Sequence, residues 1–220
     1  MLVFSCSCNT PEKTVMKKNT RASDQIIWNT DNLASIGEHT PTILGSPEII
    51  DTPGGKALLF DGVRDGIIID KHPLEAATAF TLEIVFRPDR DGAPEQRFLH
   101  LQENDSDNRL LIETRLLENN RWSLDTYMKS GETDQTLLDT SITHPLDRWY
   151  NAALVFDGNE MRDYVNGVME LSAGITSFTP PKAGKTSIGV RMNRVYWFKG
   201  AIRTIRFTPH ALTPEKFLKP

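Results

Sequence analysis

The segment from Trp149 to Gly167, WYNAALVFDGNEMRDYVNG, constrains the fold more than any other part of the chain. Two apolar runs flank Asp157-Gly158, a dipeptide that favours the positive-φ geometry of tight hairpin turns. The second run ends in Asn166-Gly167, which is another turn dipeptide. The segment therefore predicts two antiparallel strands joined by a tight turn.

Short apolar stretches recur along the rest of the chain, with turn-forming residues between them. They cover residues 48–50, 57–60, 66–70, 80–87, 97–102, 109–117, 122–128, 136–138, 149–156, 161–171, 186–190 and 197–208. In the stretch 80–87, Phe80, Leu82, Ile84 and Phe86 alternate with Thr, Glu, Val and Arg, so one face of that strand should meet the core. Many short strands at this spacing predict an all-β sandwich or barrel.

One helix is expected, and it lies near the C-terminus. Thr213 can cap it, Pro214 suits the first helical position and Glu215 supplies an early acidic residue. Phe217 and Leu218 can then dock back on the sandwich.

Charge and hydropathy exclude two kinds of partner. The chain has 25 Lys and Arg against 29 Asp and Glu, a formal net charge of −4, which gives no electrostatic footprint for nucleic acid or an anionic membrane surface. No apolar run reaches the roughly 18 residues that a membrane-spanning helix needs. We therefore expect no nucleic acid partner, and membrane attachment only through a lipid.

The N-terminal segment MLVFSCSC resembles the end of a bacterial lipoprotein signal, with Cys6 as the residue that would carry the lipid. The basic start and most of the apolar stretch of such a signal are absent, and a disordered cytosolic tail is the alternative. Residues 7–24 are polar and without periodicity. We interpret residues 1–24 as a truncated signal followed by a flexible tether, and expect the protein in a bacterial cell envelope, lipid-anchored in the periplasm or on the surface.

Four motifs follow one another along the sequence. They are ALLFDG with GIII (residues 57–69), FTLEIVFRP (80–88), the hairpin of 149–167, and IG, FKGAI and ALTPE (188–215). Together they resemble the laminin-G-like, concanavalin A-like lectin and glucanase superfamily, whose fold is a two-sheet antiparallel jelly roll. The resemblance implies a single all-β jelly-roll domain over residues 25–220, with a short C-terminal helix. Because one fold of this type hosts binders, lyases, hydrolases and adhesion modules, the fold does not decide the function.

Polar and aromatic residues gather on strands that should line the concave sheet. Glu113 and Arg115 lie two apart, and Arg191 and Asn193 precede Trp197. Arginine forks and carboxylates fix sugar hydroxyls or acidic groups, and aromatic rings stack on sugar faces. We expect these five residues to bind carbohydrate in a non-catalytic module whose partner is a polysaccharide or other glycan. The alternative is that the charges only pair with cross-strand neighbours on a solvated face.

Two further functions stay open, a polysaccharide-cleaving enzyme, which would be a lyase rather than a hydrolase, and a structural module. A retaining glycoside hydrolase needs carboxylates about 5 to 5.5 Å apart, whereas Glu113 and Glu118 face opposite sides of a regular strand. A polysaccharide lyase needs a neutralising residue and a base, for which His100, Arg115 and Tyr127 are the candidates. A structural or adhesion module without a small ligand is the other possibility.

The resemblance also implies a calcium ion at a sheet edge. Asp61 and Asp157, each followed by glycine, are the candidate ligands. Calcium takes about 6 to 8 oxygen ligands, so two aspartates do not by themselves make a site. Their alternative role is to shape the turns.

Overall fold

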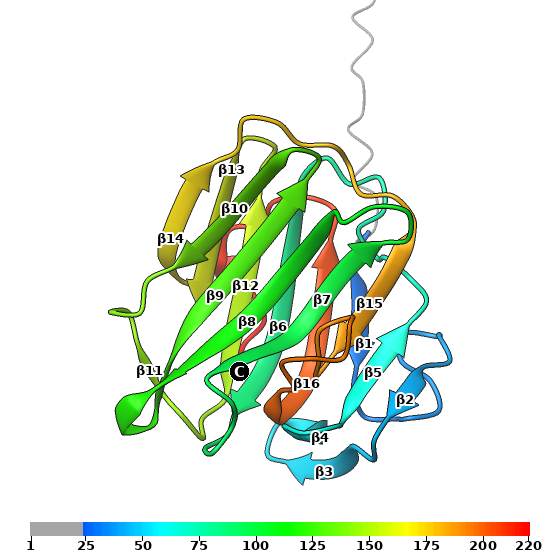
Figure 1. Cartoon of the computed structure of the whole chain (residues 1–220), viewed down its shortest axis with the longest axis vertical. Helices are drawn as coiled ribbons and strands as arrows, with labels where there is room; N and C mark the ends of the chain where they lie inside the picture. Colours follow the sequence, from blue (N-terminus) through cyan, green and yellow to red (C-terminus); the bar gives the residue numbers. More distant parts are fainter. Residues whose placement is uncertain (1–23) are drawn as a thin grey trace, which may run out of the picture.

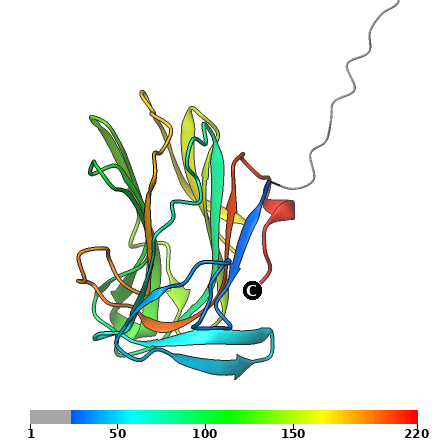
Figure 2. The same cartoon turned by 90° about the vertical axis from the view of Figure 1, so that its right-hand side faces the viewer.

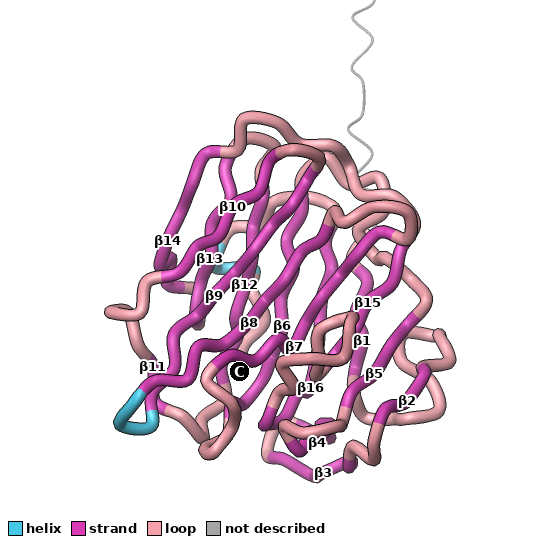
Figure 3. Tube along the Cα trace, in the orientation of Figure 1, coloured by secondary structure: helices cyan, strands magenta, loops and turns pink. Residues whose placement is uncertain are grey.

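The computed structural model describes residues 24–220, which fold into two antiparallel β-sheets packed face to face (Figures 1 and 2). The predicted lipid-attachment residue Cys6 and nearly all of the predicted signal and tether lie outside the described residues. Strand and loop make up almost the whole trace (Figure 3). None of the helical segments in the described range is long and apolar enough to cross a membrane.

Eight strands form each sheet. In spatial order the first sheet contains β14 (Val168–Gly174), β13 (Glu160–Val165), β12 (Tyr150–Phe156), β6 (Phe80–Pro88), β16 (Lys199–Thr208), β4 (Gly55–Asp61) and β3 (Glu48–Thr52), and β1 (Ile26–Asn29) pairs with β16. The second sheet contains β10 (Thr133–Leu138), β9 (Arg121–Ser130), β8 (Arg109–Leu117), β7 (Glu95–Glu103), β15 (Gly184–Ile188), β5 (Gly66–Ile69) and β2 (Thr42–Leu44), and β11 (His144–Pro145) pairs with β9. The helical segments are the 3-10 turns η1 (Glu118–Asn120) and η2 (Pro214–Lys216).

The hairpin predicted from Trp149 to Gly167 is confirmed. Strands β12 and β13 pair antiparallel, with Phe156 opposite Met161. The Asp157 Oδ1 atom accepts backbone N–H groups of Asn159 and Glu160, at 3.0 Å each, and so fixes the turn between them. The all-β two-sheet jelly roll predicted from the whole pattern is confirmed as well.

One predicted stretch, residues 161–171, is divided into two strands in the structure. Asn166 and Gly167 both have positive φ, 52° and 82°, and Val165 lies directly opposite Val168. Two positive-φ residues between paired strands are typical of the tight hairpin turn that Asn-Gly favours. The short strands β1, β2 and β11 were not predicted.

The core between the sheets is centred on stacked aromatic side chains. Phe86 of β6 lies with its ring centroid 4.5 Å from that of Phe98 in β7, so it joins one sheet to the other. Phe198 and Trp122 surround this pair, with centroids 6.3 and 5.3 Å from Phe86. All four side chains are buried, and the inward alternation predicted for β6 is confirmed because its Phe, Leu, Ile and Phe all belong to the core.

The predicted C-terminal helix is a single 3-10 turn, η2, followed by extended chain. The Thr213 side chain makes no capping hydrogen bond to it, and Phe217 already has extended backbone angles, which lets its ring pack edge-on against Tyr164 of β13 at 5.2 Å. Figure 2 shows this segment lying outside the sheet that contains β1.

The C-terminal segment covers the outer face of the first sheet. The Leu212 N–H donates to Thr81 Oγ1 and the Leu218 N–H donates to Glu83 Oε1, each at 2.8 Å. Glu83 is fully buried beneath it and pairs with Arg206, whose Nε donates to Glu83 Oε2 at 2.6 Å. The outward residues Thr81 and Glu83 of β6 are therefore buried too, beneath the C-terminal segment.

We predict that Phe86→Ala lowers the free energy of unfolding by about 3–5 kcal/mol, because it opens a cavity where the two sheets meet. Val168→Ala, at an exposed position of β14, is the control and should change it by no more than about 0.5 kcal/mol. Denaturant unfolding of both variants measures this. Equal effects of the two substitutions would show that Phe86 does not join the sheets.

Candidate functional site

The outer face of the second sheet gathers charged side chains from three neighbouring strands. The register places Glu113 of β8 opposite Arg97 of β7 and opposite Asp125 of β9. Two residues earlier in β8, Leu111 lies opposite His100 and Tyr127. Since side chains of directly opposed residues point to the same face, these six side chains share one surface.

A β-bulge in β7 determines which of its residues reach this surface. The register shifts between Arg97 and Leu99, and Phe98 and Leu99 are both fully buried. The extra inward residue puts Arg97 and His100 on the same outer face, although they are three positions apart and regular alternation would place them on opposite faces.

Two arginines and three carboxylates form a connected network on this face, which we call the arginine network. Arg97 Nε lies 3.0 Å from Glu113 Oε2, and Arg115 Nη2 lies 3.4 Å from the same oxygen and also contacts Asp125. Glu95 Oε2 bridges Nη1 of Arg97 at 3.0 Å and Nη1 of Arg115 at 2.7 Å. The side chains of Glu113 and Asp125 are only 3% and 2% exposed. Glu113 and Asp125 therefore lie beneath the guanidinium groups and, together with the more exposed Glu95, hold them in place.

Burial changes the protonation of the two inner carboxylates. Burial, with the nearby charge of Asp125, raises the pKa of Glu113 to about 7 against the opposing charges of Arg97, Arg115 and Arg191. Burial also raises the pKa of Asp125, opposed first by Arg115. Partial protonation of Glu113 near neutral pH therefore brings the negative charge of the three carboxylates closer to the positive charge of the two arginines.

Above the network lies a hollow of about 180 Å³, which we call the Tyr196 hollow. It is lined by Arg97, Arg109, Leu111, Glu113, Arg115, Asp125, Tyr127, Thr136, Arg191 and Tyr196. The Tyr196 ring stacks on the Arg97 guanidinium, with 3.7 Å between the guanidinium carbon and the ring centroid. Tyr196 is 41% exposed, so part of its ring stays open to a ligand.

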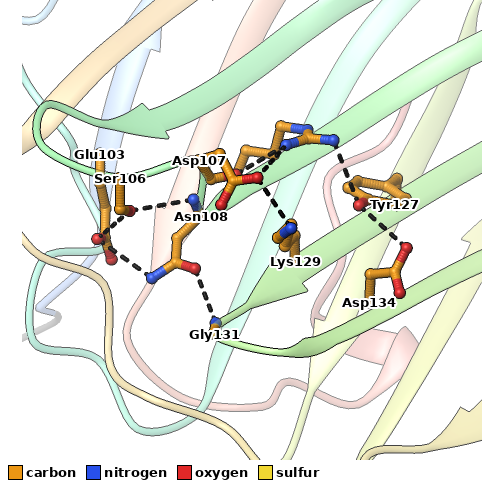
Figure 4. A network of polar contacts seen from close by, with 9 residues as sticks. Glu103, Ser106, Asp107, Asn108, Tyr127, Lys129, Gly131 and Asp134 are labelled. Atoms are coloured by element: carbon orange, nitrogen blue, oxygen red, sulfur yellow. Dashed lines mark hydrogen bonds and ion pairs between the residues drawn. The ribbon is translucent and has the colours of Figure 1, made fainter.

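A second hollow, of about 250 Å³, adjoins the first and shares Arg109 and Arg191 with it. We call it the His100 hollow, and it is lined by His100, Gln102, Asp107, Arg109, Arg191 and Asn193. Figure 4 shows the polar contacts of its lining residue Asp107, which lies 2.8 Å from Lys129 Nζ, and the neighbouring hydrogen bond of 3.3 Å that Tyr127 donates to Asp134. The Glu103 carboxylate accepts hydrogen bonds from Ser106 and Asn108 and fixes the loop between β7 and β8 beside it (Figure 4).

The structure brings most of the sequence-predicted residues together on this surface. Glu113, Arg115, Tyr127 and Arg191 line the Tyr196 hollow. His100 and Asn193 line the adjoining one.

Trp197 is the predicted binding residue that lines neither hollow. Its ring lies over Gly66 of β5, where a Cβ atom would approach it to 3.4 Å. Tyr196 has φ of 60°, a rare value for a bulky residue. This backbone conformation turns the tyrosine toward the network and the tryptophan toward β5, so the aromatic residue at the hollow is Tyr196.

Arg97, Arg109 and Asp125 also belong to the site and were not predicted as binding residues. Arg109 shares strand parity with Glu113 and Arg115, a signal that the alternation in residues 109–117 could have supplied. Arg97 and Asp125 reach the site through strand pairing. Pairing between distant segments leaves no trace in local periodicity.

The two candidate calcium ligands lie at opposite ends of the first sheet. Asp61 Oδ1 accepts hydrogen bonds from the backbone N–H groups of Val63, Arg64 and Asp65. The Asp157 carboxylate accepts hydrogen bonds within its own turn and pairs with Arg162. Among residues 24–220, no three His, Cys, Asp or Glu side chains gather as metal ligands. The two aspartates therefore do not form a calcium-binding site with each other, and calcium binding stays a prediction.

The raised pKa of Glu113 predicts a specific pH dependence. Between pH 4.5 and about 7 the folded protein holds a proton on Glu113 that the unfolded chain has lost. The stability contributed this way is complete below pH 4.5 and is lost as pH rises to 7, at about 1.4 kcal/mol per pH unit. The difference in unfolding free energy between wild type and Glu113→Gln should therefore fall over this range and then level off. Denaturant titrations at several pH values measure it, and a constant difference would contradict the burial of this carboxylate.

Comparison with solved structures identifies similar folds. Domain 4 of AbnA, a GH43 extracellular arabinanase from Geobacillus stearothermophilus, in complex with arabinotriose, shares 20% identity with a TM-score of 0.65, and the match covers 87% of this chain and 94% of that one. The binding domain of Paraclostridial Mosquitocidal Protein 1 shares 15% identity with a TM-score of 0.66, and the botulinum neurotoxin serotype D binding domain 13% with 0.63. Each toxin match covers 87% of this chain but only 50% and 49% of the toxin domain. These likenesses show the fold.

No curated protein matches the sequence at a significant level. A family model described as the concanavalin A-like lectin/glucanases superfamily matches residues 61–216, well over half of the 220 residues. The matched range includes both hollows and the aromatic core, and the resemblance inferred from the sequence motifs is confirmed. The chain belongs to the concanavalin A-like lectin/glucanases superfamily.

Proposed function

We propose that this domain binds a glycan chain, without cleaving it, on the outer face of its second sheet. The observation that carries the proposal is the Tyr196 hollow, in which an exposed aromatic ring lies directly beside ordered arginine side chains. Glycan sites combine such groups, because rings stack on the apolar faces of sugars and guanidinium groups donate to their oxygens. The C-terminal segment covers the outer face of the first sheet at Thr81 and Glu83, whereas the outer face of the second sheet carries the two adjoining hollows.

The arginine network preorganises the site, because its side chains are fixed before a ligand binds. Arg97 and Arg115 are each held by two or more carboxylate contacts, and their side chains are only 13% and 19% exposed. A side chain that is already fixed loses little conformational entropy when a ligand binds. Arg109 is fixed as well, because it donates to Tyr127 Oη at 3.3 Å and lies over its ring at 4.9 Å.

The same geometry favours binding over the lyase alternative. His100 is a weak base, since burial and the charges of Arg191, Arg109 and Arg97 lower its pKa to about 3. Burial raises the pKa of Tyr127, which also makes its phenolate harder to form. Arg115 is also far from the other two lyase candidates. His100 and Tyr127 lie opposite Leu111, and Arg115 lies four positions further along the same strand, or about 13 Å away.

Two other observations support the proposal without deciding it. The arabinanase domain of similar fold is in complex with arabinotriose, a sugar oligomer, which is an analogy at the level of the fold. Attachment to a bacterial cell envelope through a lipid on Cys6 is part of the proposal and depends on the sequence of the N-terminal segment alone.

We predict that Tyr196→Ala weakens glycan binding at least about tenfold, or about 1.4 kcal/mol, because it removes the exposed ring of the hollow. A glycan array probed with the full chain identifies the ligand, with arabinotriose among the sugars, and calorimetry measures the affinity. Trp149→Ala is the matched control, since that ring also lies beside arginines, Arg87 and Arg203, but on the first sheet.

Wild-type affinity for the Trp149 variant together with loss for the Tyr196 variant would support the site. If no glycan bound, or if both variants bound as wild type does, the proposal would fail and a structural or adhesion module would be the better account.

A further inference from the structure

Arg191 differs from the other arginines of the site in its partners. Arg97, Arg109 and Arg115 each make ion pairs or hydrogen bonds with neighbouring side chains. The Arg191 side chain makes neither with any residue in the described range 24–220, although it lines both hollows. A guanidinium with its donors unused, at the junction of two hollows, is suited to a partner from outside the chain.

His100 contributes a second unused donor. Its Nδ1 accepts the backbone N–H of Met192 at 3.0 Å, and its low pKa keeps the ring neutral, so the proton resides on Nε2. The side chain is 1% exposed, and Nε2 has no hydrogen-bond partner within residues 24–220. Buried donors are nearly always satisfied in folded proteins, so an unpartnered one lining a hollow points to a bound acceptor.

The charge around the His100 hollow is positive on balance. Arg109 Nε is buried there without a hydrogen-bond partner, like His100 Nε2. The carboxylate in the lining, that of Asp107, is already paired with Lys129 at 2.8 Å and lies 3.8 Å from Arg109 Nη1. Gln102 and Asn193 add amide groups, which can bond to sugar hydroxyls.

We propose that the His100 hollow is a subsite for an oxyanion carried by the glycan, with Arg191 as the main contact and His100 Nε2–H and Arg109 as further donors. The inference rests on the proposed glycan binding and adds a substrate class, acidic glycans. The oxyanion is the carboxylate of a uronic acid or a sulfate ester, which present the same acceptor oxygens to these donors. The net charge of the chain, −4, makes this local preference a property of the site rather than of the whole protein.

The test compares oligosaccharides that differ only in the anionic group. One pair is an oligogalacturonate and its methyl ester, and the other is a heparin hexasaccharide and its desulfated form. Arabinotriose is the neutral reference. Calorimetry on the full chain should give an affinity at least about tenfold higher for the oligogalacturonate than for its methyl ester, or for the heparin hexasaccharide than for its desulfated form, which keeps its carboxylates. This preference should be lost as salt screens the contact.

Arg191→Gln should remove the preference, lowering the affinity for the acidic ligand about tenfold, to that of its uncharged or desulfated counterpart. Arg194→Gln is the matched control, because it removes the same charge from the same loop but lies outside both hollows. Melting temperatures of the two variants check that both are folded.

The outcomes separate the two proposals. Preference in the first pair identifies a carboxylate and preference in the second a sulfate ester, and each supports the oxyanion subsite. Equal binding of acidic and neutral sugars, or equal effects of the two substitutions, would overturn the subsite while glycan binding stands. Absence of binding to every neutral and acidic sugar would overturn the proposed function, and the subsite with it.

Discussion

The apolar contact between the two sheets is the constraint on which the rest of the structure depends. Phe86 and Phe98, stacked at 4.5 Å, fix which face of their strands is turned inward. Because side chains alternate along a strand, the same contact decides which residues of β7, β8 and β9 must face outward. The charged surface is therefore a consequence of the core, since any slip of register by one residue would bury the arginines and expose the phenylalanines.

The buried charges on the two outer faces of the sandwich are covered in different ways. On the first sheet, Glu83 and Arg206 pair beneath the C-terminal segment and are sealed from solvent. On the second sheet, Glu113 and Asp125 are equally buried, but they are covered by arginines rather than by another part of the backbone. Glu83 and Arg206 form a structural ion pair. Glu113 and Asp125 instead form the floor of the proposed binding site, where burial raises their pKa and their contacts fix the guanidinium groups at the surface.

The sequence allows the fold to be predicted well because its signals are local. The turn at Asp157-Gly158, the alternation in β6 and the turn at Asn166-Gly167 each depend on a few adjacent residues. The site is less predictable because it is assembled by pairing. The bulge at Phe98 brings Arg97 and His100 to one face, and the pairing of β8 with β9 joins Glu113 to Asp125, where sequence reasoning considered Glu118. The positive φ of Tyr196 exchanges the roles expected for two neighbouring aromatic residues, and no motif marks it.

The central claim is that a ligand binds on the outer face of the second sheet, and backbone amide shifts in NMR spectra test it most directly. The full chain, labelled with ¹⁵N, would be titrated with the best oligosaccharide from the array. The account predicts that the largest shifts fall on Leu111, Tyr127 and the loop of residues 191–197, with Thr81 and Glu83 on the first sheet unaffected. Shifts concentrated on the first sheet or around Asp61, with none at Leu111 and Tyr127, would contradict it.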